Sequence, residues 1–469
     1  MALVRYSFPK ELAKSFCIFQ GVPRFEVMKV YWFCVPLVMY VCFFGVVPSA
    51  PAGENPVSLT MEQCIIKGLQ DNPRVESFRK YMKSAEYGVA AAKGHLGPSM
   101  TANYRYLRNE HDISIYSLAQ DDWLLNLNLH QPLFTGFRLL SILEKSELAR
   151  DQAQARLEQV EQGLILNVQQ VFLNLLQARE NVRSSKDSLR RLQSQLTVIN
   201  AFYDVGLRPK LDVLQAQVDV ARAEQRLLAA DIAVQVHTSR LNTLLDIPVQ
   251  ENIDYTGRLE FIPFARDLQY CLDTSMHHRP DMDIAAKSIA IAEKDAKISA
   301  SGFYPQLGAD VDYYSHGDEP NAYGNGYGSE RDNDYWTAQV TLSYTFFESG
   351  ANYHSWKQAK ETMSALNQDY LNLKNEISFE VKSNFDQLKE TATRIGVTKK
   401  ALVSARESYR MATARYEAQV GTNTDVLDAQ AKVTLAEADG TQALADYQLA
   451  LSRLYYSMGM RNLSLMPLP

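Results

Sequence analysis

Two aspartates near the end of the chain have a spacing that places two carboxylates side by side. Asp425 and Asp428 stand three residues apart in a segment that reads as a helix, so they share one helix face. Adjacent carboxylates attract cations and repel anions. A plain structural role is the alternative, with Asp425 as N-terminal cap and Asp428 as an acid favoured by the helix dipole. An earlier segment with the same motif has Asp212 followed by Gln215, so it carries one carboxylate fewer.

Other groups with catalytic potential lack the surroundings that catalysis needs. Gly324, Gly326 and Gly328 form a Gly-rich run, but it lies in a polar stretch between strand-like segments and no helix follows it, unlike a nucleotide-binding loop. His277 and His278 have no nearby acids or cysteines arranged for a metal, and a solvated helix end explains them better. Neither a Gly-x-Ser-x-Gly nor a Walker motif occurs. We therefore expect no enzyme activity, no cofactor and no metal site.

The composition describes a folded, acidic protein. The 469 residues are 46% hydrophobic and 22% charged, with a formal net charge of −6. The first 52 residues hold five Lys or Arg against two acids, so the remainder carries −9. Because neutralising phosphates needs a basic surface, we expect no nucleic acid as partner.

Residues 1–52 have the pattern of an export signal. Val30–Val47 is apolar and aromatic, follows a lysine, and ends before Pro48–Ala52, which offers an Ala-x-Ala cleavage site. We expect cleavage after Ala52, with Met28 as an alternative translation start. An uncleaved N-terminal anchor is the alternative.

Cleavage would leave two cysteines, Cys64 and Cys271, in an oxidising compartment. A disulfide between them is one option. We favour two separate buried thiols, because the cysteines occupy equivalent positions in an internal repeat and equivalent positions need not touch.

The sequence is an internal duplication. Short motifs of the first half recur in the same order in the second half, at offsets near 207 and then near 213. The matched pairs are Cys64 with Cys271, Asn72-Pro73 with Arg279-Pro280, Trp123 with Trp336, Val205-Gly206 with Val420-Gly421, and Asp212–Gln217 with Asp425–Gln430. Each half reads as helix, strand, strand, very long helix, sharp break and long helix. We expect repeat one at 53–245, a linker at 246–264 and repeat two at 265–469.

Four segments alternate apolar and polar residues with a period of two, as strands with one apolar face do. The shorter sets lie in 102–106 and 307–313. The clearest apolar sets are Trp123, Leu125, Leu127 and Leu129 in one segment and Trp336, Val340 and Leu342 in another. A half-buried soluble sheet shows the same pattern. After an export signal we favour a lipid-facing barrel wall, since a membrane strand needs only about 9 to 11 residues.

Four strands are too few to close a barrel, and lipid does not tolerate an open sheet edge. The barrel must then be shared between identical chains. The polar loops at about 107–122 and 315–334 suit the outward end of such a barrel.

Two segments predict unusually long helices. Residues 137–203 and 351–420 contain no proline and one glycine each. About 70 helical residues would reach roughly 100 Å. Their apolar residues recur in steps of three and four, as in helices packed side by side in a coiled coil. A plain coiled-coil rod would explain these segments alone, but not the strand pairs between them.

Together these features resemble the TolC-like outer-membrane efflux family. The resemblance rests on two strand pairs, each followed by a helical hairpin with a Val-Gly turn and an Asp-Val-Leu-x-Ala-Gln start to its return helix, and covers about Leu59 to Leu463. It implies a mainly α fold with a small β part. Long coiled-coil hairpins would form an α-helical barrel, and three chains would share a 12-stranded transmembrane β-barrel with four strands per chain.

The resemblance also implies a function and partners. The protein would be the passive exit duct of a tripartite efflux pump or a type I secretion system, in the bacterial outer membrane with its helical tunnel in the periplasm. Its partners would be two further copies, outer-membrane lipid, a periplasmic adaptor (membrane-fusion) protein and an inner-membrane transporter of the RND, ABC or MFS type. The residues carry no preference among drug, metal, siderophore and polypeptide cargo.

Family likeness assigns roles to the tips of the hairpins, which form the closed end of the tunnel. Three copies of Asp425 and Asp428 would place six carboxylates around the pore, with Asp212 as a weaker third contributor. The adaptor would contact the turns Val205, Gly206, Leu207 and Val420, Gly421, Thr422. Alternatively, Gly206 and Gly421 serve only to supply positive φ at helix ends.

The two turns differ in length when counted from their Val-Gly pairs. Five residues separate Gly206 from Asp212, but three separate Gly421 from Asp425. The arginine that holds the closed end elsewhere in the family therefore has no clear counterpart in the second turn. We hypothesise instead that Arg208 or Lys210 reaches Asp425 of a neighbouring hairpin.

Two other classes of protein are weaker alternatives. A self-contained porin would need many more strands than four. A periplasmic coiled-coil scaffold would have no use for strand faces rich in tryptophan and leucine.

Overall fold

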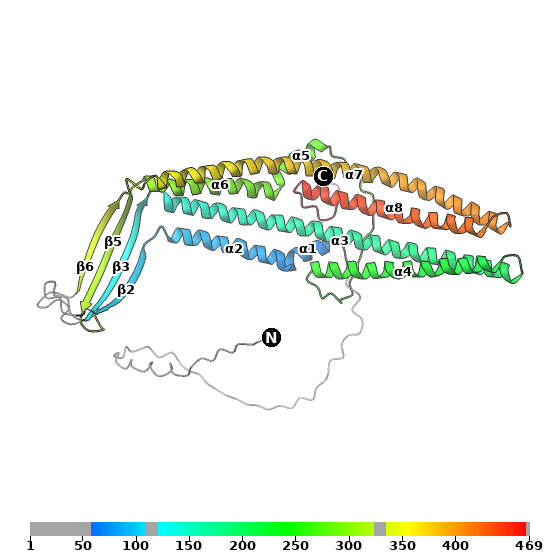
Figure 1. Cartoon of the computed structure of the whole chain (residues 1–469), viewed down its shortest axis with the longest axis horizontal. Helices are drawn as coiled ribbons and strands as arrows, with labels where there is room; N and C mark the ends of the chain where they lie inside the picture. Colours follow the sequence, from blue (N-terminus) through cyan, green and yellow to red (C-terminus); the bar gives the residue numbers. More distant parts are fainter. Residues whose placement is uncertain (1–57, 109, 111–120, 323–333, 466–469) are drawn as a thin grey trace, which may run out of the picture. The chain divides into compact units, whose positions relative to one another are not determined.

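The computed structural model describes residues 58–108, 110, 121–322 and 334–465 (Figure 1). All of these belong to the compact unit that begins at Asn55. The expected export signal, the Gly-rich run at 324–328 and most of both polar loops lie outside the described residues. Within the described ranges, no helix is both long enough and apolar enough to cross a membrane.

The order of elements is duplicated, as the sequence predicts. The first half holds β1 (Ser58–Leu59), α1 (Met61–Asp71), α2 (Pro73–Gly94), β2 (Ser99–Arg108), β3 (Asp121–Thr135), α3 (Arg138–Asp204) and α4 (Lys210–Leu244). The second holds β4 (Asp254–Tyr255), α5 (Leu268–His278), α6 (Pro280–Ala300), η1 (Ser301–Phe303), β5 (Gln306–Gly317), β6 (Asp334–Ser343), α7 (Ala351–Glu417) and α8 (Asn423–Ser457). The two long helices have 67 residues each, and the two return helices have 35 each.

The first helix of each half is broken by a proline, a division that the sequence analysis did not anticipate. Pro73 and Pro280 begin α2 and α6, because proline suits the first turn of a helix but cannot continue one. The residue before each proline also ties the break to the end of a return helix. Asn72 Nδ2 donates to the Leu244 carbonyl at 2.9 Å.

The four long strands form one antiparallel sheet in the order β2-β3-β5-β6. Cross-strand partners share a face of the sheet, so the register tests the predicted alternation. One face carries Met100, Ala102, Tyr104, Tyr106, Trp123, Leu125, Leu127, Leu129, Leu307, Ala309, Val311, Tyr313, Trp336, Ala338, Val340 and Leu342. The predicted apolar sets therefore join into one continuous apolar face.

The opposite face of the sheet is polar and hydrogen-bonded between strands. Asp312 accepts from Asn126 Nδ2 at 3.1 Å and from Asn128 Nδ2 at 2.9 Å. Beside them, His130 Nδ1 lies 2.7 Å from Asp310 Oδ1. A sheet with one apolar and one hydrogen-bonded polar face suits a wall between lipid and water.

Two consecutive left-handed residues turn the chain from each strand pair into the long helix. They are Gly136 and Phe137 before α3, and Ser349 and Gly350 before α7. Glycine is required at Gly136 for a second reason, because an added Cβ would lie 2.6 Å from the Ser301 carbonyl oxygen.

The helices pack side by side along their lengths (Figure 1). Near the sheet, α3 lies between α2 and α6, and α6 packs in turn against α7. Farther from the sheet, α3 pairs with α4 and α7 with α8, and α3 also contacts α8. This side-by-side arrangement confirms the coiled-coil periodicity of the sequence.

Cys64 and Cys271 are free and fully buried in two separate hydrophobic clusters, as the favoured alternative predicts. Burial raises the pKa of the Cys64 thiol to about 12 and that of the Cys271 thiol to about 11. Both therefore remain thiols near neutral pH.

Candidate functional site

The two hairpin turns have equal length, which corrects the sequence analysis. Five residues, 205–209, separate α3 from α4, and five residues, 418–422, separate α7 from α8. The two Val-Gly pairs therefore occupy different places in their turns. Val205-Gly206 begins the first turn, whereas Val420-Gly421 sits two residues further along the second. Counting from those pairs made the second turn look shorter.

One residue after each long helix has a left-handed backbone, and in the second turn this residue is not the predicted glycine. Gly206 has φ +75°, as predicted, but the second turn places Gln419 in this conformation at φ +61°. In both turns the residue after the left-handed one donates back to the helix, Leu207 N to Phe202 O at 2.9 Å and Val420 N to Arg415 O at 3.0 Å. Gly421 does not supply positive φ.

Gly421 is needed for close approach instead. A Cβ on Gly421 would lie 3.1 Å from the Tyr416 nitrogen and 3.2 Å from the Arg415 carbonyl carbon. A Cβ there would be tighter than most real Cβ contacts and would require the end of α7 to shift by a few tenths of an ångström, so glycine suits this close approach.

Asp425 belongs to a capping box, and Thr422 is the N-cap of α8. The Thr422 hydroxyl accepts from Asp425 N at 3.2 Å, and Asp425 Oδ2 accepts from Thr422 N at 3.0 Å. The structural alternative of Asp425 as N-cap is therefore wrong in detail. Hydrogen bonds from the Thr422 backbone and then from its hydroxyl lower the pKa of Asp425, and Arg415 adds to the effect. The carboxylate is thus held ionised at neutral pH.

The structure brings Asp425 and Asp428 together in one groove. A hollow of about 730 Å³ lies between α7 and α8 near their tip, and both aspartates line it. Arg415 from α7 and Lys432 from α8 line it too. Asp212 lies apart on the first hairpin, where its charge acts on the Tyr416 hydroxyl. The groove therefore holds two of the three predicted carboxylates.

Arg208 joins the two hairpin turns within one chain. Its Nη2 donates to the Gly421 carbonyl at 3.2 Å, and its guanidinium carbon lies 4.7 Å from the centre of the Tyr416 ring. Tyr416 is buried in a small cluster with Ile199, Val426 and others from all four helices of the two hairpins. Within the chain, Arg208 thus contacts the Gly421 carbonyl and the Tyr416 ring. Its hypothesised partner Asp425 is instead hydrogen-bonded to Thr422.

A second contact between the hairpins lies further from the tip. Glu437 of α8 binds Arg191 of α3 at 3.2 Å and Arg406 of α7 at 3.1 Å. The Ser184 hydroxyl donates to the same carboxylate at 3.4 Å. Sequence analysis missed Glu437 and Tyr416 as contact residues, because pairs so far apart in the chain leave no local pattern.

Apolar side chains stand exposed on both turns. Val205 is 69% exposed, Leu207 is 55% exposed and Val420 is 68% exposed. Apolar groups at the ends of helical hairpins form a small surface for contact with another protein.

On the apolar face of the sheet, exposure rises toward the edge strand β6. Trp336, Val340 and Leu342 are 71%, 67% and 67% exposed. Trp123 is half-buried against Tyr104 and Tyr106, with ring centres 5.5 Å and 4.4 Å away. A single chain therefore leaves a wide apolar surface in contact with its surroundings.

Comparison with known families identifies the class of protein. The sequence model described as "Outer membrane efflux protein" matches residues 65–246 and 272–460, which together cover most of the chain. The chain belongs to this family. The two matched segments fall one in each half of the duplication.

Relatives of this efflux protein extend over most of its length. TolC of Vibrio cholerae is 22% identical over 88% of the chain and 93% of its own length. The alkaline protease secretion protein AprF of Pseudomonas aeruginosa is 20% identical over 83% of the chain and 82% of its own. The solved outer membrane protein VceC of Vibrio cholerae has the same fold, with a TM-score of 0.73 at 16% identity, covering 85% of this chain and 96% of VceC.

Membership confirms the fold, location and function that the sequence predicts. The efflux protein is an exit duct of efflux or secretion systems, located in the outer membrane with a helical tunnel in the periplasm. Its family consists of ducts that are trimeric and work with pump partners, and is not a family of enzymes.

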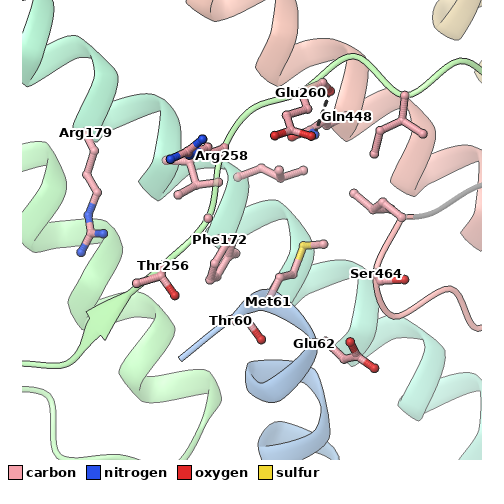
Figure 2. A pocket seen from close by; sticks show the side chains of 15 residues that line it. Thr60, Met61, Glu62, Phe172, Arg179, Thr256, Arg258, Glu260, Gln448 and Ser464 are labelled. Carbon is pink, nitrogen blue, oxygen red and sulfur yellow. Dashed lines mark hydrogen bonds between the residues drawn. The ribbon is translucent and has the colours of Figure 1, made fainter. Parts of the chain in front are cut away.

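The efflux protein has another hollow, of about 740 Å³, where the linker crosses α3 (Figure 2). Gln448 Nε2 donates to the Glu260 carbonyl at 3.0 Å on one side of it, and Arg179 binds Asp254 at 3.1 Å on another. These contacts fasten the linker to the helices. No cluster of three metal-ligating side chains occurs among the described residues.

Proposed function

We propose that this chain forms a homotrimeric duct in which each copy contributes four strands and two helical hairpins. Residues 53–245 and 265–469 would be the two repeats on either side of the linker 246–264. The observation that carries the proposal is the open four-stranded sheet, whose apolar face and hydrogen-bonded polar face need two further copies to close. Twelve strands would then enclose the outlet.

The apolar face of the sheet is proposed to contact outer-membrane lipid. The residues concerned are Trp123, Leu125, Leu127, Leu129, Trp336, Val340 and Leu342. Their support is the shared face and the high exposure along β6. The polar face, with Asp310 and Asp312, would line the water-filled outlet.

The pore constriction is proposed to lie at the hairpin tips. Three copies of the groove that holds Asp425 and Asp428 would give six carboxylates, and Asp212 would add a weaker contribution from the first hairpin. The support is the common groove and the lowered pKa of Asp425. We expect the closed end to prefer cations.

The exposed turns are the proposed docking site of the periplasmic adaptor. Val205, Gly206 and Leu207 would form one contact, and Val420, Gly421 and Thr422 the other, shifted by two residues along its turn. The adaptor would connect the duct to an inner-membrane transporter of the RND, ABC or MFS type. The support is the exposed apolar side chains at the turns.

The duct function is tested with purified mature protein in planar lipid bilayers. We expect cation-selective conductance from a particle that light scattering in detergent sizes as a trimer. Affinity capture from an envelope extract, cross-linked through Val205→Cys or Val420→Cys, should retain an adaptor, while a cysteine placed at the exposed Lys80 of α2 should not. A water-soluble monomer without conductance would overturn the proposal.

A further inference from the structure

Residues in the first half of the chain have equivalent residues in the second half, so the contacts of the two halves can be compared pair by pair. Residues from α1 through β2 have counterparts 207 positions later, and residues from β3 through α4 have counterparts 213 positions later. Ser99 and His130, for example, become Gln306 and Ser343, which are sheet partners. All ten pairs between β2 and β3 map in this way onto the ten pairs between β5 and β6. The duplication thus reproduces strand register without a shift.

The same operation holds for a contact between helices. Asn72 Nδ2 donates to the carbonyl of Leu244. Their counterparts, Arg279 and Ser457, make the same connection, with Arg279 Nη1 donating to the Ser457 carbonyl at 3.4 Å. The side chains differ, but the position of the contact is preserved.

The central pair of the sheet has no duplicate within the chain. β3 and β5 join the two halves, and their counterparts are β6 and β2, the two open edges. We propose that β6 pairs with β2 of a second copy in the register that places Thr341 opposite Arg105. This register follows from Asn128 and Asp312, which are partners between β3 and β5. The proposal rests on the trimeric duct and assigns the contacts that close it.

The proposed register matches the two faces of the sheet. It places Val340 opposite Tyr106 of the next copy, so two residues of the apolar face meet. On the polar face, the proposed register exchanges the roles of hydrogen-bond donor and acceptor between equivalent positions. Within the chain, the Asp312 carboxylate accepts from two side-chain amides, those of Asn126 and Asn128. Across the seam, the Arg105 guanidinium, which is 60% exposed in the single chain and lies 3.8 Å from Asp122 of its own chain, faces further oxygen acceptors.

Those acceptors are the side chains of Gln339 and Thr341. Both are exposed at the edge of the single chain. A guanidinium donates only, and the amide and hydroxyl oxygens accept, so the set can satisfy itself across the seam.

The helices beside the sheet extend the seam. Within the chain, α3 packs on α6, and Gln152 Nε2 donates to the Ser288 hydroxyl at 2.7 Å. The counterparts are Ala365 on α7 and Tyr81 on α2 of the next copy. Gln152 faces the smaller Ser288 within the chain, and Ala365 would face the larger Tyr81 across the seam, so both places pair one small with one large side chain.

A second helix contact supports the same seam. Lys294 Nζ donates to Glu144 at 2.7 Å between α6 and α3. Their counterparts are Tyr87 and Lys357, which would place a lysine beside a tyrosine ring. Tyr81 and Tyr87 are 63% and 66% exposed in the single chain. Both would be covered by α7 of the next copy.

Disulfide trapping in the full-length trimer tests the register. Thr341→Cys with Arg105→Cys and, separately, Val340→Cys with Tyr106→Cys should give covalent dimers and trimers under mild oxidation. The off-register controls pair Thr341→Cys with Asn103→Cys or with Leu107→Cys. Each control moves one Cα by about 7 Å, beyond disulfide reach. The wild-type chain gives the background, and its two cysteines within the described residues, Cys64 and Cys271, are buried.

The outcomes separate the register from the duct. Covalent trimers from both in-register pairs and little from the controls would support the proposal. A trimer by light scattering that cross-links best through Asn103 or Leu107, or through none of the four pairs, would overturn the register and leave the duct intact. A monomeric particle would overturn both.

An exchange of side-chain size tests the helix part independently of cysteine chemistry. Ala365→Gln alone should crowd Tyr81, and Tyr81→Ser alone should leave a gap, so each should lower the temperature at which the trimer dissociates. The double variant re-creates the pair seen between Gln152 and Ser288 and should recover most of the loss. Additive losses would show that these two residues do not meet.

Discussion

Asp425 is both a structural and an electrostatic residue, and the two roles can be separated. Its carboxylate closes the capping box with Thr422, while Asp428 lines the same groove without a part in that box. We expect Asp428→Asn to lower the preference for K⁺ over Cl⁻ without changing the melting temperature of the trimer. Asp425→Asn should lower both. Reversal potentials across a KCl gradient measure the ion preference, and circular dichroism measures the melting temperature. An unchanged reversal potential in the double variant would show that the two aspartates do not line the pore.

The pH dependence of this selectivity follows from the lowered pKa of Asp425. A carboxyl whose folded pKa lies below the ordinary value of 3.8 stays charged from neutral pH down past that value. The capping contribution of Asp425 and its own share of the cation preference are therefore both present above about pH 4, and both are lost as the pH falls through the folded pKa. In the Asp428→Asn variant, where Asp425 is the remaining carboxylate of the pair, reversal potentials measured from pH 7 to pH 3 should stay level to about pH 4. A decline centred near pH 6 would assign the selectivity to another group.

Arg208 should restrain the closed tip, because it is the cation that bridges the two turns. Removing its hydrogen bond to Gly421 and its stacking on Tyr416 should cost about 1 to 3 kcal/mol. We expect Arg208→Ala to raise single-channel conductance and Arg208→Lys to have an intermediate effect. Lys210→Ala, in the same turn, is the matched control. Equal conductance in Arg208→Ala and wild type would show that the bridge does not limit opening, and a change on Lys210→Glu would instead implicate Lys210.

Sequence reasoning at the residue scale succeeded where a side chain's position follows from its neighbours. The three-residue spacing put Asp425 and Asp428 in one groove, because a helix face is a local property. It could not assign Tyr416 or Glu437, whose partners lie on another hairpin. It also misplaced the N-cap, since Thr422 with Asp425 three residues later is the stronger capping signal.

At the scale of elements, the two turns solve the same backbone problem with different residues. Gly206 takes the left-handed position at no steric cost, whereas Gln419 carries a side chain there. We expect Gln419→Gly to stabilise the tip by about 1 kcal/mol and Gly206→Ala to destabilise it by about as much. Melting temperatures of the two trimers, in the same detergent, should move in opposite directions. Two shifts of the same sign would mean that the turns are strained elsewhere.

The helices and strands were largely predictable, because hydrophobic periodicity and the positions of proline and glycine are local signals. Proline-free stretches with steps of three and four became α3 and α7, and alternating segments became β3 and β6. The equivalence of the turns was not predictable from Val-Gly pairs. Two residues are too short a motif to fix register when glutamine can replace glycine at the left-handed position. Pro73 and Pro280 were visible in the sequence, but they were used only to align the two repeats and not to predict where a helix begins.

At the scale of the whole molecule, the sheet has too few strands to shield its own edges. Family membership places the chain in the outer membrane, and the sheet register separates an apolar from a polar face. A charge should therefore be tolerated on one face and rejected on the other. Val340 and Thr337 provide the comparison, because both lie on the edge strand β6 with side chains on opposite faces, and Thr337 lies away from the Arg105 contact proposed for Gln339 and Thr341.

We expect Val340→Lys to prevent accumulation of the trimer in the outer membrane and Thr337→Lys to allow it. An ammonium on the lipid side near mid-depth costs about 2 to 4 kcal/mol, and each trimer would carry three. The same ammonium on the polar face would meet water and the carboxylates Asp310 and Asp312. Native gels of outer-membrane fractions measure the trimer, with total protein checked by immunoblot. If both variants accumulate equally, the apolar face does not meet lipid; if only Thr337→Lys is lost, the two faces are reversed.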